Sequence, residues 1–480
     1  MVNKISASLT LFACTISGGI LNLPAIFKSM TLLEDFILTT IAAVTTMFSL
    51  MILVTFHGVD PTIKSYGELL IWLGGVKFAK LVELVLGLFL VGVTGGSFIV
   101  IHNFFIDKTP TDLHAGLATA CGAILILGLA WPSDIGRLAT ASSFSVLAFV
   151  FLVFTLIYYG VDSLDNGHHV DEWSWTNDDG SETAADDDTV TETNPDGSFF
   201  LVKMAKHLPP IIYAFGCQIQ IYEIFLDVEK ERASMFSQGG IHGLWHFMPV
   251  IFAACTSMIA CFSCVGFFGV LSFPNEEIDS DVLIMLEQKG TLGAVARATL
   301  VVAITLSAPL ITLPARNCIL SAAIYLFTGE ADSGSSSDDD FTLTKEELCS
   351  EFERKNKKWR NASTTFCVSC SCVLAISGVK FGTLLNVLGA FVAAPLMIIL
   401  PAVALLKKLT MSEKQFEEEE DEKIQKHYEK LLGESSNGRT ISTSKHSLTE
   451  SVRLGMIFIS AVCVFVGFIT FGVNLVELLS

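Results

Sequence analysis

The chain has 480 residues, of which 51% are hydrophobic and only 16% are charged, and its mean hydropathy is +0.57. Soluble domains carry about 25% charged residues, so this composition excludes an ordinary soluble protein and predicts a polytopic integral membrane protein. The formal net charge is -19, but the acidic residues gather in a few loops, and the lack of a basic face argues against a nucleic acid as partner.

Apolar stretches that are long enough to cross about 30 Å of hydrocarbon, which takes about 18 residues, recur along the whole chain. We therefore predict an all-α integral membrane fold with eleven transmembrane helices in a single domain, 1–480. The helices are expected at 6–29, 35–56, 80–105, 113–130, 138–160, 199–226, 245–271, 294–327, 363–379, 383–406 and 452–475.

The first apolar stretch is interrupted at its middle by Ser17-Gly18-Gly19, which Asn22 and Pro24 follow. The sixth stretch has the same kind of interruption at Phe215-Gly216-Cys217-Gln218. Unwound backbone at membrane depth survives only where it lines a cavity or is buried in protein, so paired breaks indicate a solute site. A glycine pair can instead serve close helix packing. Because the breaks fall in the first and sixth helices, they predict a 5+5 inverted repeat plus one additional helix.

The residues beside the two breaks are the candidate substrate-binding residues. Glycines let the chain leave helical geometry and present backbone N–H and C=O groups to a ligand. The half-helix that restarts near Ile20 directs its positive dipole end at the gap, which suits a carboxylate. The predicted set is Ser17, Gly18, Gly19, Ile20, Tyr213, Phe215, Gly216, Cys217 and Gln218. None of these positions carries a charged side chain, which favours a neutral solute.

The loops set the expected orientation. Most Lys and Arg fall in alternate loops on one side, which predicts a cytoplasmic amino terminus. Residues 161–197 are then an acidic extracytoplasmic loop, either simply solvated or steering cations toward the entrance. Residues 328–361 and 407–450 are cytoplasmic loops, either solvated tethers or regulatory contacts. The twelve cysteines fall almost entirely in apolar segments, and no metal site is expected at Cys261-Cys264 or Cys367-Cys370-Cys372.

Four of the predicted helices resemble those of a known family. Leu21 to Ala25, after Gly18-Gly19-Ile20, is similar to the broken first helix of the amino acid/auxin permeases. Residues 208–227 resemble the matching helix of the sodium-coupled neutral amino acid transporters of that family, and 305–316 and 388–401 extend the likeness. The resemblance implies a leucine-transporter-like fold and a secondary transporter that moves amino acids by alternating access.

The resemblance also bears on the coupling ion. Sodium-dependent members hold a cation between their first and eighth helices, which assigns the hydroxyls of Thr305 and Ser307 to a cation site. Where those members carry Asn, this chain has Ala13, so proton coupling is at least as well supported as sodium coupling. Glu223, about two turns after the second break, is the predicted proton carrier. Glu83 and His102, near the ends of the third helix, are alternatives.

The leading hypothesis is a secondary transporter of neutral amino acids, coupled to protons or sodium. A transport-like amino acid receptor that signals through its cytoplasmic loops is the alternative from another class, and an ion channel lacks a repeated selectivity loop. We expect no enzyme, because the chain has neither His-Glu-x-x-His nor Gly-x-Ser-x-Gly. We expect no cofactor beyond the coupling ion, and a monomer in the plasma membrane or in a vacuolar or lysosomal membrane.

Overall fold

The computed structural model describes residues 4–16, 18–59, 63, 65–108, 111–131, 139–165, 197–222, 224–226, 228, 241–274, 276–328 and 357–410. Every regular element within these ranges is helical. Seven of the described helices are long and apolar enough to cross a membrane, or eight if one bent pair counts as a span. The predicted all-α membrane fold is therefore confirmed, while the count of eleven stays a prediction. The eleventh predicted helix, 452–475, lies outside the described residues.

The first predicted span is the bent pair. Helix α1 (Lys4–Thr15) ends before the break, and the 3-10 helix η1 (Gly18–Asn22) and α2 (Leu23–Lys28) follow it. The two halves meet at 58°. Pro24 lies in the first turn of α2, where the backbone N–H that proline lacks has no partner within the helix. The predicted break in the first span is thus present.

Six further helices lie at predicted spans: α3 (Leu32–Val59), α4 (Tyr66–Ile106), α5 (Asp112–Ala130), α6 (Ala139–Asp165), α9 (Ile241–Ser272) and α11 (Thr291–Thr328). Helix α4 begins earlier than predicted, because Gly75 (φ 78) joins a leading helical piece to the span through a kink. A positive φ costs glycine little. Helix α6 continues to Asp165, so the loop predicted from residue 161 starts later than expected.

The sixth span begins with α7 (Gly197–Ala214) and continues after the predicted break with η3 (Gln218–Gln220). A short helix, α10 (Val282–Gln288), precedes α11 and was not predicted. The ninth helix, α13 (Lys357–Ile376), begins inside the loop predicted at 328–361. The tenth span consists of α14 (Phe381–Leu388), the π-helical segments η4 (Gly389–Ala393) and η5 (Pro395–Ile399), and α15 (Leu400–Thr410). Helix α15 ends inside the loop predicted at 407–450.

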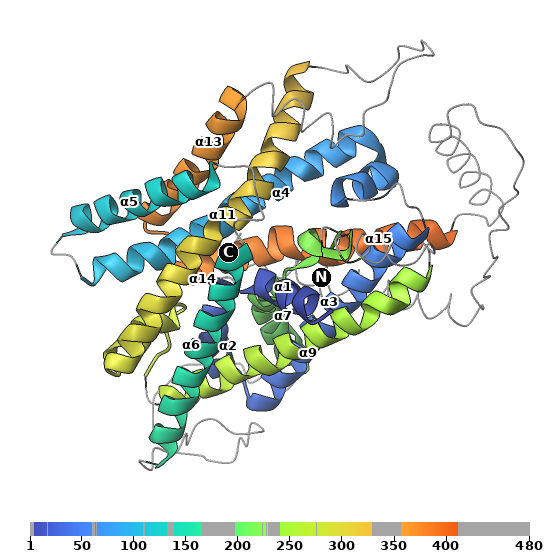
Figure 1. The fold of residues 1–480 in the computed structure, drawn as a ribbon. Helices are drawn as coiled ribbons and strands as arrows, with labels where there is room; N and C mark the ends of the chain where they lie inside the picture. The colour runs from blue at the N-terminus through green and yellow to red at the C-terminus, as the bar shows by residue number, and fades with distance from the viewer. Residues whose placement is uncertain are drawn as a thin grey trace, which may run out of the picture.

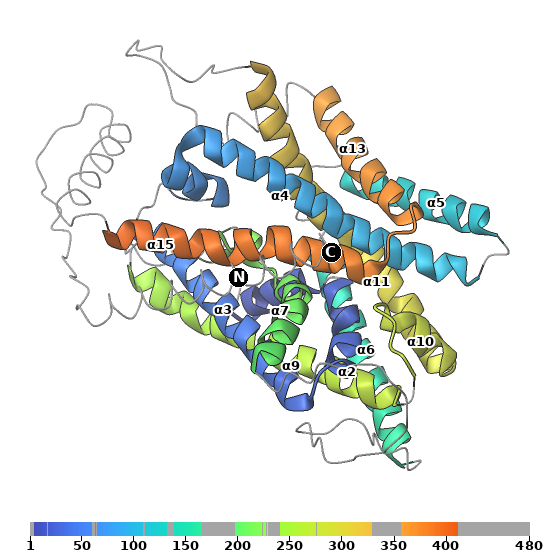
Figure 2. The same ribbon diagram turned by 180° about the vertical axis from the view of Figure 1, so that it is seen from behind.

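The broken helices lie inside the bundle. Figures 1 and 2 show α1 and α7 near its middle, with α3, α6 and α9 on one side and α4, α5, α11 and α13 on the other. The tenth span passes between these two groups. Helix α4 packs against α11 and α13, while α3 and α6 pack against α9. The breaks are therefore enclosed by helices on both sides.

Aromatic side chains tie the broken helices to their neighbours. Phe12 of α1 contacts Phe149 of α6 with ring centroids 5.8 Å apart, and Phe149 contacts Phe262 of α9 at 6.5 Å. Phe262 in turn contacts Phe215, just after α7, at 4.9 Å. Such tilted and edge-to-face pairs contribute about 0.5–1.5 kcal/mol beyond the area that they bury. The row of rings fixes both broken helices to the same scaffold.

The outer helices expose apolar side chains, as a membrane requires. Leu113 on α5 is 72% exposed and Leu147 on α6 is 68% exposed. Large apolar side chains in this number are stable at a surface only if hydrocarbon covers them. These faces of α5 and α6 are therefore the lipid-facing surface of the bundle.

Candidate functional site

The first break is buried and closely packed. All five residues of η1 are buried. A Cβ atom at Gly18 would lie 2.6 Å from the ring of Phe381, and one at Gly19 would lie 2.7 Å from the ring of Tyr213. It would also lie 3.2 Å from the Cα atom of Ala214. Because any side chain at these positions would overlap a neighbour, the glycines let η1 approach both α7 and α14.

The second break replaces the α-helical hydrogen-bond pattern with a tighter turn. The backbone N–H of Phe215 still donates to the C=O of Ile211 at 3.1 Å, in the α-helical manner. The N–H of Gly216 donates instead to the C=O of Tyr213, also at 3.1 Å. The next N–H, that of Cys217, donates to the side-chain Oε1 of Gln218 at 3.0 Å. The helix therefore ends at the predicted position.

Three buried polar atoms at the second break have no hydrogen-bond partner within the described part of the chain. They are Nε2 of Gln218, Oε1 of Gln220 and the hydroxyl of Tyr222. An unpaired buried polar group costs about 1–3 kcal/mol, so each such group calls for a partner. Their concentration within five residues suits recognition of a polar solute.

The tenth span closes the site from a third side. A Cβ atom at Gly216 would lie 2.9 Å from Cε of Met397, and one at Gly389 would lie 2.2 Å from the backbone oxygen of Pro209 in α7. Sequence reasoning missed this span as part of the site. Pro395 and Pro401 within one apolar stretch were a usable signal, because each proline removes a helical donor.

The irregular backbone of the tenth span is supported by side chains. Pro401 has no N–H, so it cannot donate to the carbonyl oxygen four residues earlier, that of Met397, or to the one five residues earlier, that of Leu396. The hydroxyl of Ser49 on α3 donates to the Met397 oxygen, and the hydroxyl of Tyr66 on α4 donates to the Leu396 oxygen. The π-helical stretch is thus tied to both halves of the bundle.

Two of the predicted ion-coupling residues, Thr305 and Ser307, lie on α11. The hydroxyl of Thr305 donates to the C=O of Val301 at 2.7 Å, and that of Ser307 donates to the C=O of Ile304 at 3.1 Å. Both hydroxyls therefore bond to their own helix. Helix α1, which carries Ala13, packs mainly against α6 and α9.

Two predicted residues, Ser17 and Glu223, lie outside the described residues. The structure brings Gly19 together with Tyr213, whereas Gly18 lies against Phe381; Ile20, Cys217 and Gln218 are all buried. The ring of Phe215 packs on Phe262 of α9, so in this conformation it anchors the helix. The cysteines at 261, 264, 367, 370 and 372 are free.

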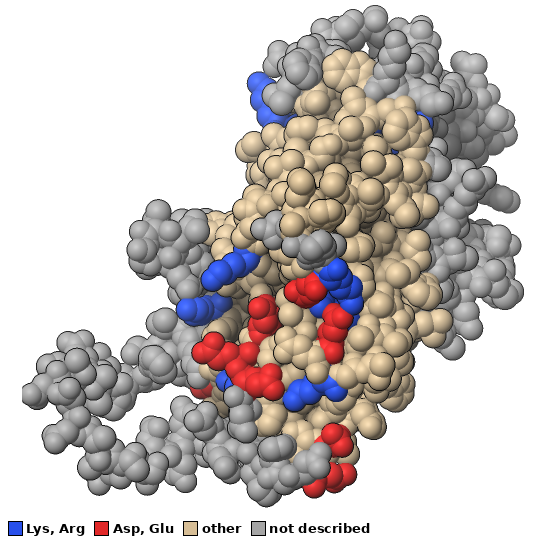
Figure 3. All heavy atoms as spheres, turned by 90° about the vertical axis from the view of Figure 1, so that its left-hand side faces the viewer, with Lys and Arg blue, Asp and Glu red and all other residues tan. Residues whose placement is uncertain are grey.

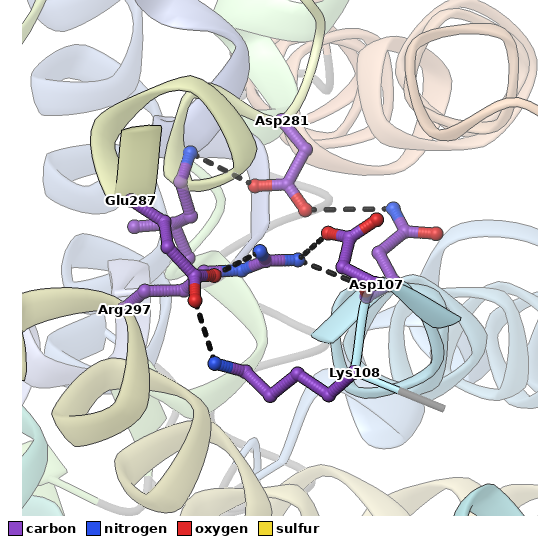
Figure 4. Close-up of polar contacts among 7 residues, drawn as sticks. Asp107, Lys108, Asp281, Glu287 and Arg297 are labelled. Atoms are coloured by element: carbon purple, nitrogen blue, oxygen red, sulfur yellow. Dashed lines mark hydrogen bonds and ion pairs between the residues drawn. The ribbon is translucent and has the colours of Figure 1, made fainter. Parts of the chain in front are cut away.

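Sequence reasoning missed a second polar region, at the end of the bundle that holds α10. Acidic and basic side chains gather there on an otherwise mostly uncharged surface (Figure 3). Arg297 of α11 is buried, at 2% exposure, and its guanidinium group pairs with Glu287 and, at 2.8 Å, with Asp107 (Figure 4). An Arg inside the predicted span 294–327 was the available signal, since such a charge needs a buried partner.

Two interrupted helices that meet inside an apolar multi-pass bundle are the arrangement of a membrane transporter. The sequence model of the family described as "Transmembrane amino acid transporter protein" matches residues 3–426, and the chain belongs to this family. No curated protein matches the chain by direct sequence comparison. Among solved structures, the chain is similar to a substrate-bound, outward-open Na+-coupled sialic acid symporter at 12% identity and a TM-score of 0.47, over 98% of this chain and 90% of that one.

Proposed function

We propose that this transporter is a secondary active carrier of neutral amino acids that works by alternating access. The solute would lie between η1 and the segment that follows α7. The observation that carries the proposal is the unpaired polar side-chain atoms of Gln218, Gln220 and Tyr222 at one break, beside the buried glycine backbone at the other. A zwitterion offers both the donors and the acceptors that such groups need.

The neutrality of the solute is inferred from the residues around it. Neither Gly18–Asn22 nor the stretch 213–222 contains Asp, Glu, Lys or Arg. A buried site without a fixed charge discriminates against a charged side chain, because that charge would lose its hydration without gaining a partner. We therefore expect neutral amino acids to be preferred over dibasic and acidic ones.

We place proton coupling ahead of sodium coupling. Ala13 has no side-chain oxygen, so its side chain supplies no ligand to a sodium ion. A sodium site needs several oxygen ligands held at one point.

The amino terminus is proposed to be cytoplasmic, which places α10 on the opposite, outer side of the membrane.

Uptake into liposomes tests the proposal. Purified protein would be reconstituted and offered radiolabelled neutral, acidic and dibasic amino acids under an inward proton gradient, an inward sodium gradient, or neither. We expect accumulation of neutral amino acids that is driven by the proton gradient and abolished by a protonophore. Binding without accumulation would instead support the receptor alternative, and steady single-channel currents would support a channel.

A further inference from the structure

The ring of Phe381, at the start of α14, fills a space that two glycines border. The residue is buried, at 3% exposure. A Cβ atom at Gly18 of η1 would lie 2.6 Å from Cζ of the ring, and one at Gly96 of α4 would lie 3.5 Å from Cε2. Both η1 and α14 pack against α4. We call this space, bordered by Gly18 and Gly96 and filled by the ring of Phe381, the ring slot.

Gly96 leaves more room in the ring slot than the ring of Phe381 uses. Among the described residues, the nearest atoms to its Cβ position lie at 3.5 Å and 3.8 Å, so a methyl group would fit in ordinary van der Waals contact. A Cβ atom at Gly92 or Gly95, on the same helix, would instead lie 2.7 Å or 2.6 Å from a leucine side chain. Glycine inside a helix is destabilising relative to alanine. Packing against Phe381 therefore does not explain why position 96 lacks a side chain.

The ring slot adjoins the first break. Gly18 is followed by Gly19, whose Cβ position lies 2.7 Å from the ring of Tyr213. Phe89 of α4 contacts the ring of Tyr213 edge-on, with centroids 6.1 Å apart. Phe89 and Gly96 are seven residues apart, which places both on the same face of α4. A solute whose carboxylate is held by the backbone of η1 would therefore meet aromatic rings and glycine next to its own side chain.

We propose that the ring slot receives the side chain of the solute, and that the ring of Phe381 holds its place in this conformation. When α14 moves away from η1, an aromatic ring of the solute takes the position of the Phe381 ring. The carrier therefore prefers phenylalanine, tyrosine and tryptophan over other neutral amino acids. This specificity rests on the proposed function, because it concerns the same site.

The preference follows from the shape of the ring slot. A flat ring fits there, because the structure holds one beside Gly18 and Gly96. Alanine would leave the slot empty and leucine would fill it only in part, and each missing atom forfeits dispersion contacts. One methylene group in an apolar pocket changes selectivity by about 10- to 200-fold. The room beside Gly96 also admits a ring larger than that of phenylalanine.

Counterflow into liposomes measures this preference without an ion gradient. Liposomes that contain the purified full chain would be preloaded with unlabelled phenylalanine, and entry of radiolabelled phenylalanine would be measured against external tyrosine, tryptophan, leucine or alanine. We expect the aromatic amino acids to compete at concentrations at least about tenfold lower than alanine. A parallel series with radiolabelled alanine shows whether small neutral amino acids are carried in their own right. Equal competition by alanine would overturn the proposal.

Gly96→Val tests the ring slot itself. The added side chain fills the room beside the ring, so phenylalanine uptake should fall by about tenfold or more relative to alanine uptake. The ratio of the two uptakes is the readout, because a merely destabilised protein would lose both equally. Gly128→Val on α5 is the matched control, since no described residue from another helix lies within 4 Å of its Cβ position. It should leave the ratio unchanged.

Gly96→Ala is the second variant, for use if Gly96→Val does not fold. Its methyl group lies at ordinary contact distance from Phe381, so the fold is preserved. The methyl group narrows the slot for the largest solute first. Tryptophan uptake should therefore fall several-fold relative to phenylalanine uptake.

An unchanged ratio in either Gly96 variant would overturn the proposal. Uptake of alanine without uptake of aromatic amino acids would overturn it as well, and would leave the proposed function in place. A chain that carries no amino acid would refute the proposed function and this specificity together.

Discussion

The two breaks and the α10 end are both buried, yet they are held together in different ways. At the breaks, glycine backbone lies against the rings of Phe381 and Tyr213, and charged side chains are missing from η1 and from 213–222. At the α10 end, a buried Arg297 is surrounded by carboxylates. The breaks are therefore held together by close packing, and the α10 end is held together by ion pairs. Substitutions that add volume should therefore disrupt the breaks, and substitutions that remove charge should disrupt the α10 end.

The largest expected effect is at the α10 end. Arg297→Met removes the cation that Glu287, Asp107 and the buried Asp281 share, and roughly 3 kcal/mol of the free energy of unfolding should be lost. Denaturant unfolding in detergent micelles measures the loss. Arg297→Lys keeps the charge without the planar fork and should recover only part of it. Unchanged stability in Arg297→Met would mean that shape, not charge, holds this end.

The next effect is at the first break. Gly19→Ala places a Cβ atom 2.7 Å from the ring of Tyr213 and 3.2 Å from the Cα atom of Ala214. Overpacking of this kind costs about 1–3 kcal/mol, and uptake in liposomes should fall by about tenfold or more. Gly116→Ala on α5 is the matched control, because nothing lies within 4 Å of its Cβ position. If both variants transport equally well, close approach at Gly19 is not required.

A smaller effect, of opposite sign on stability, is expected at the second break. Gln220→Leu removes a buried oxygen that has no partner in the described part of the chain, so stability should rise by up to about 1 kcal/mol. Uptake should fall, because the same oxygen is proposed to bind the solute. Thermal unfolding and the KM for uptake are measured on the same preparation. Loss of stability together with unchanged KM would assign Gln220 a structural role.

The smallest effect is at the rim of the α10 end. Lys108 is 40% exposed and pairs with Glu287 at 2.6 Å, so Lys108→Met should cost less than about 1 kcal/mol, and less still at high salt. Burial alone would raise the pKa of Glu287, but hydrogen bonds from Lys108 and Arg297 hold it below 4.5. The stability from this pair is therefore present at neutral pH and is lost as the pH falls below about 4.5. Unfolding at several pH values tests this, and a large loss at neutral pH would contradict it.

The parts of the site that depend on local sequence were predictable. Gly18, Gly19 and Gly216 interrupt apolar stretches, and a helix break in an apolar stretch is a property of neighbouring residues. Their spacing predicted that the two breaks belong to one site, and the contact between Gly19 and Tyr213 agrees with this.

The parts that depend on distant contacts were not predictable from one sequence. Met397 and Phe381 join the site only because the tenth span folds back between the two helix groups. Asp281 is buried only because α10 returns onto α11, and a short loop between two predicted spans gives no sign of this. Arg297 was the exception, since a charge inside a span requires a partner wherever that partner lies.

The π-helical segments of the tenth span also affect how experiments on it are interpreted. A helical-wheel diagram assigns each residue to a face by turning about 100° per residue, and each extra residue in a wide turn shifts that assignment by a similar angle. η4 and η5 are both of this wide type. A cysteine scan across Phe381–Lys408 that assumes uniform α-helix would therefore place residues after Ile399 on the wrong face. Reactivity toward a water-soluble reagent should follow two separate periodic patterns, one on each side of these segments.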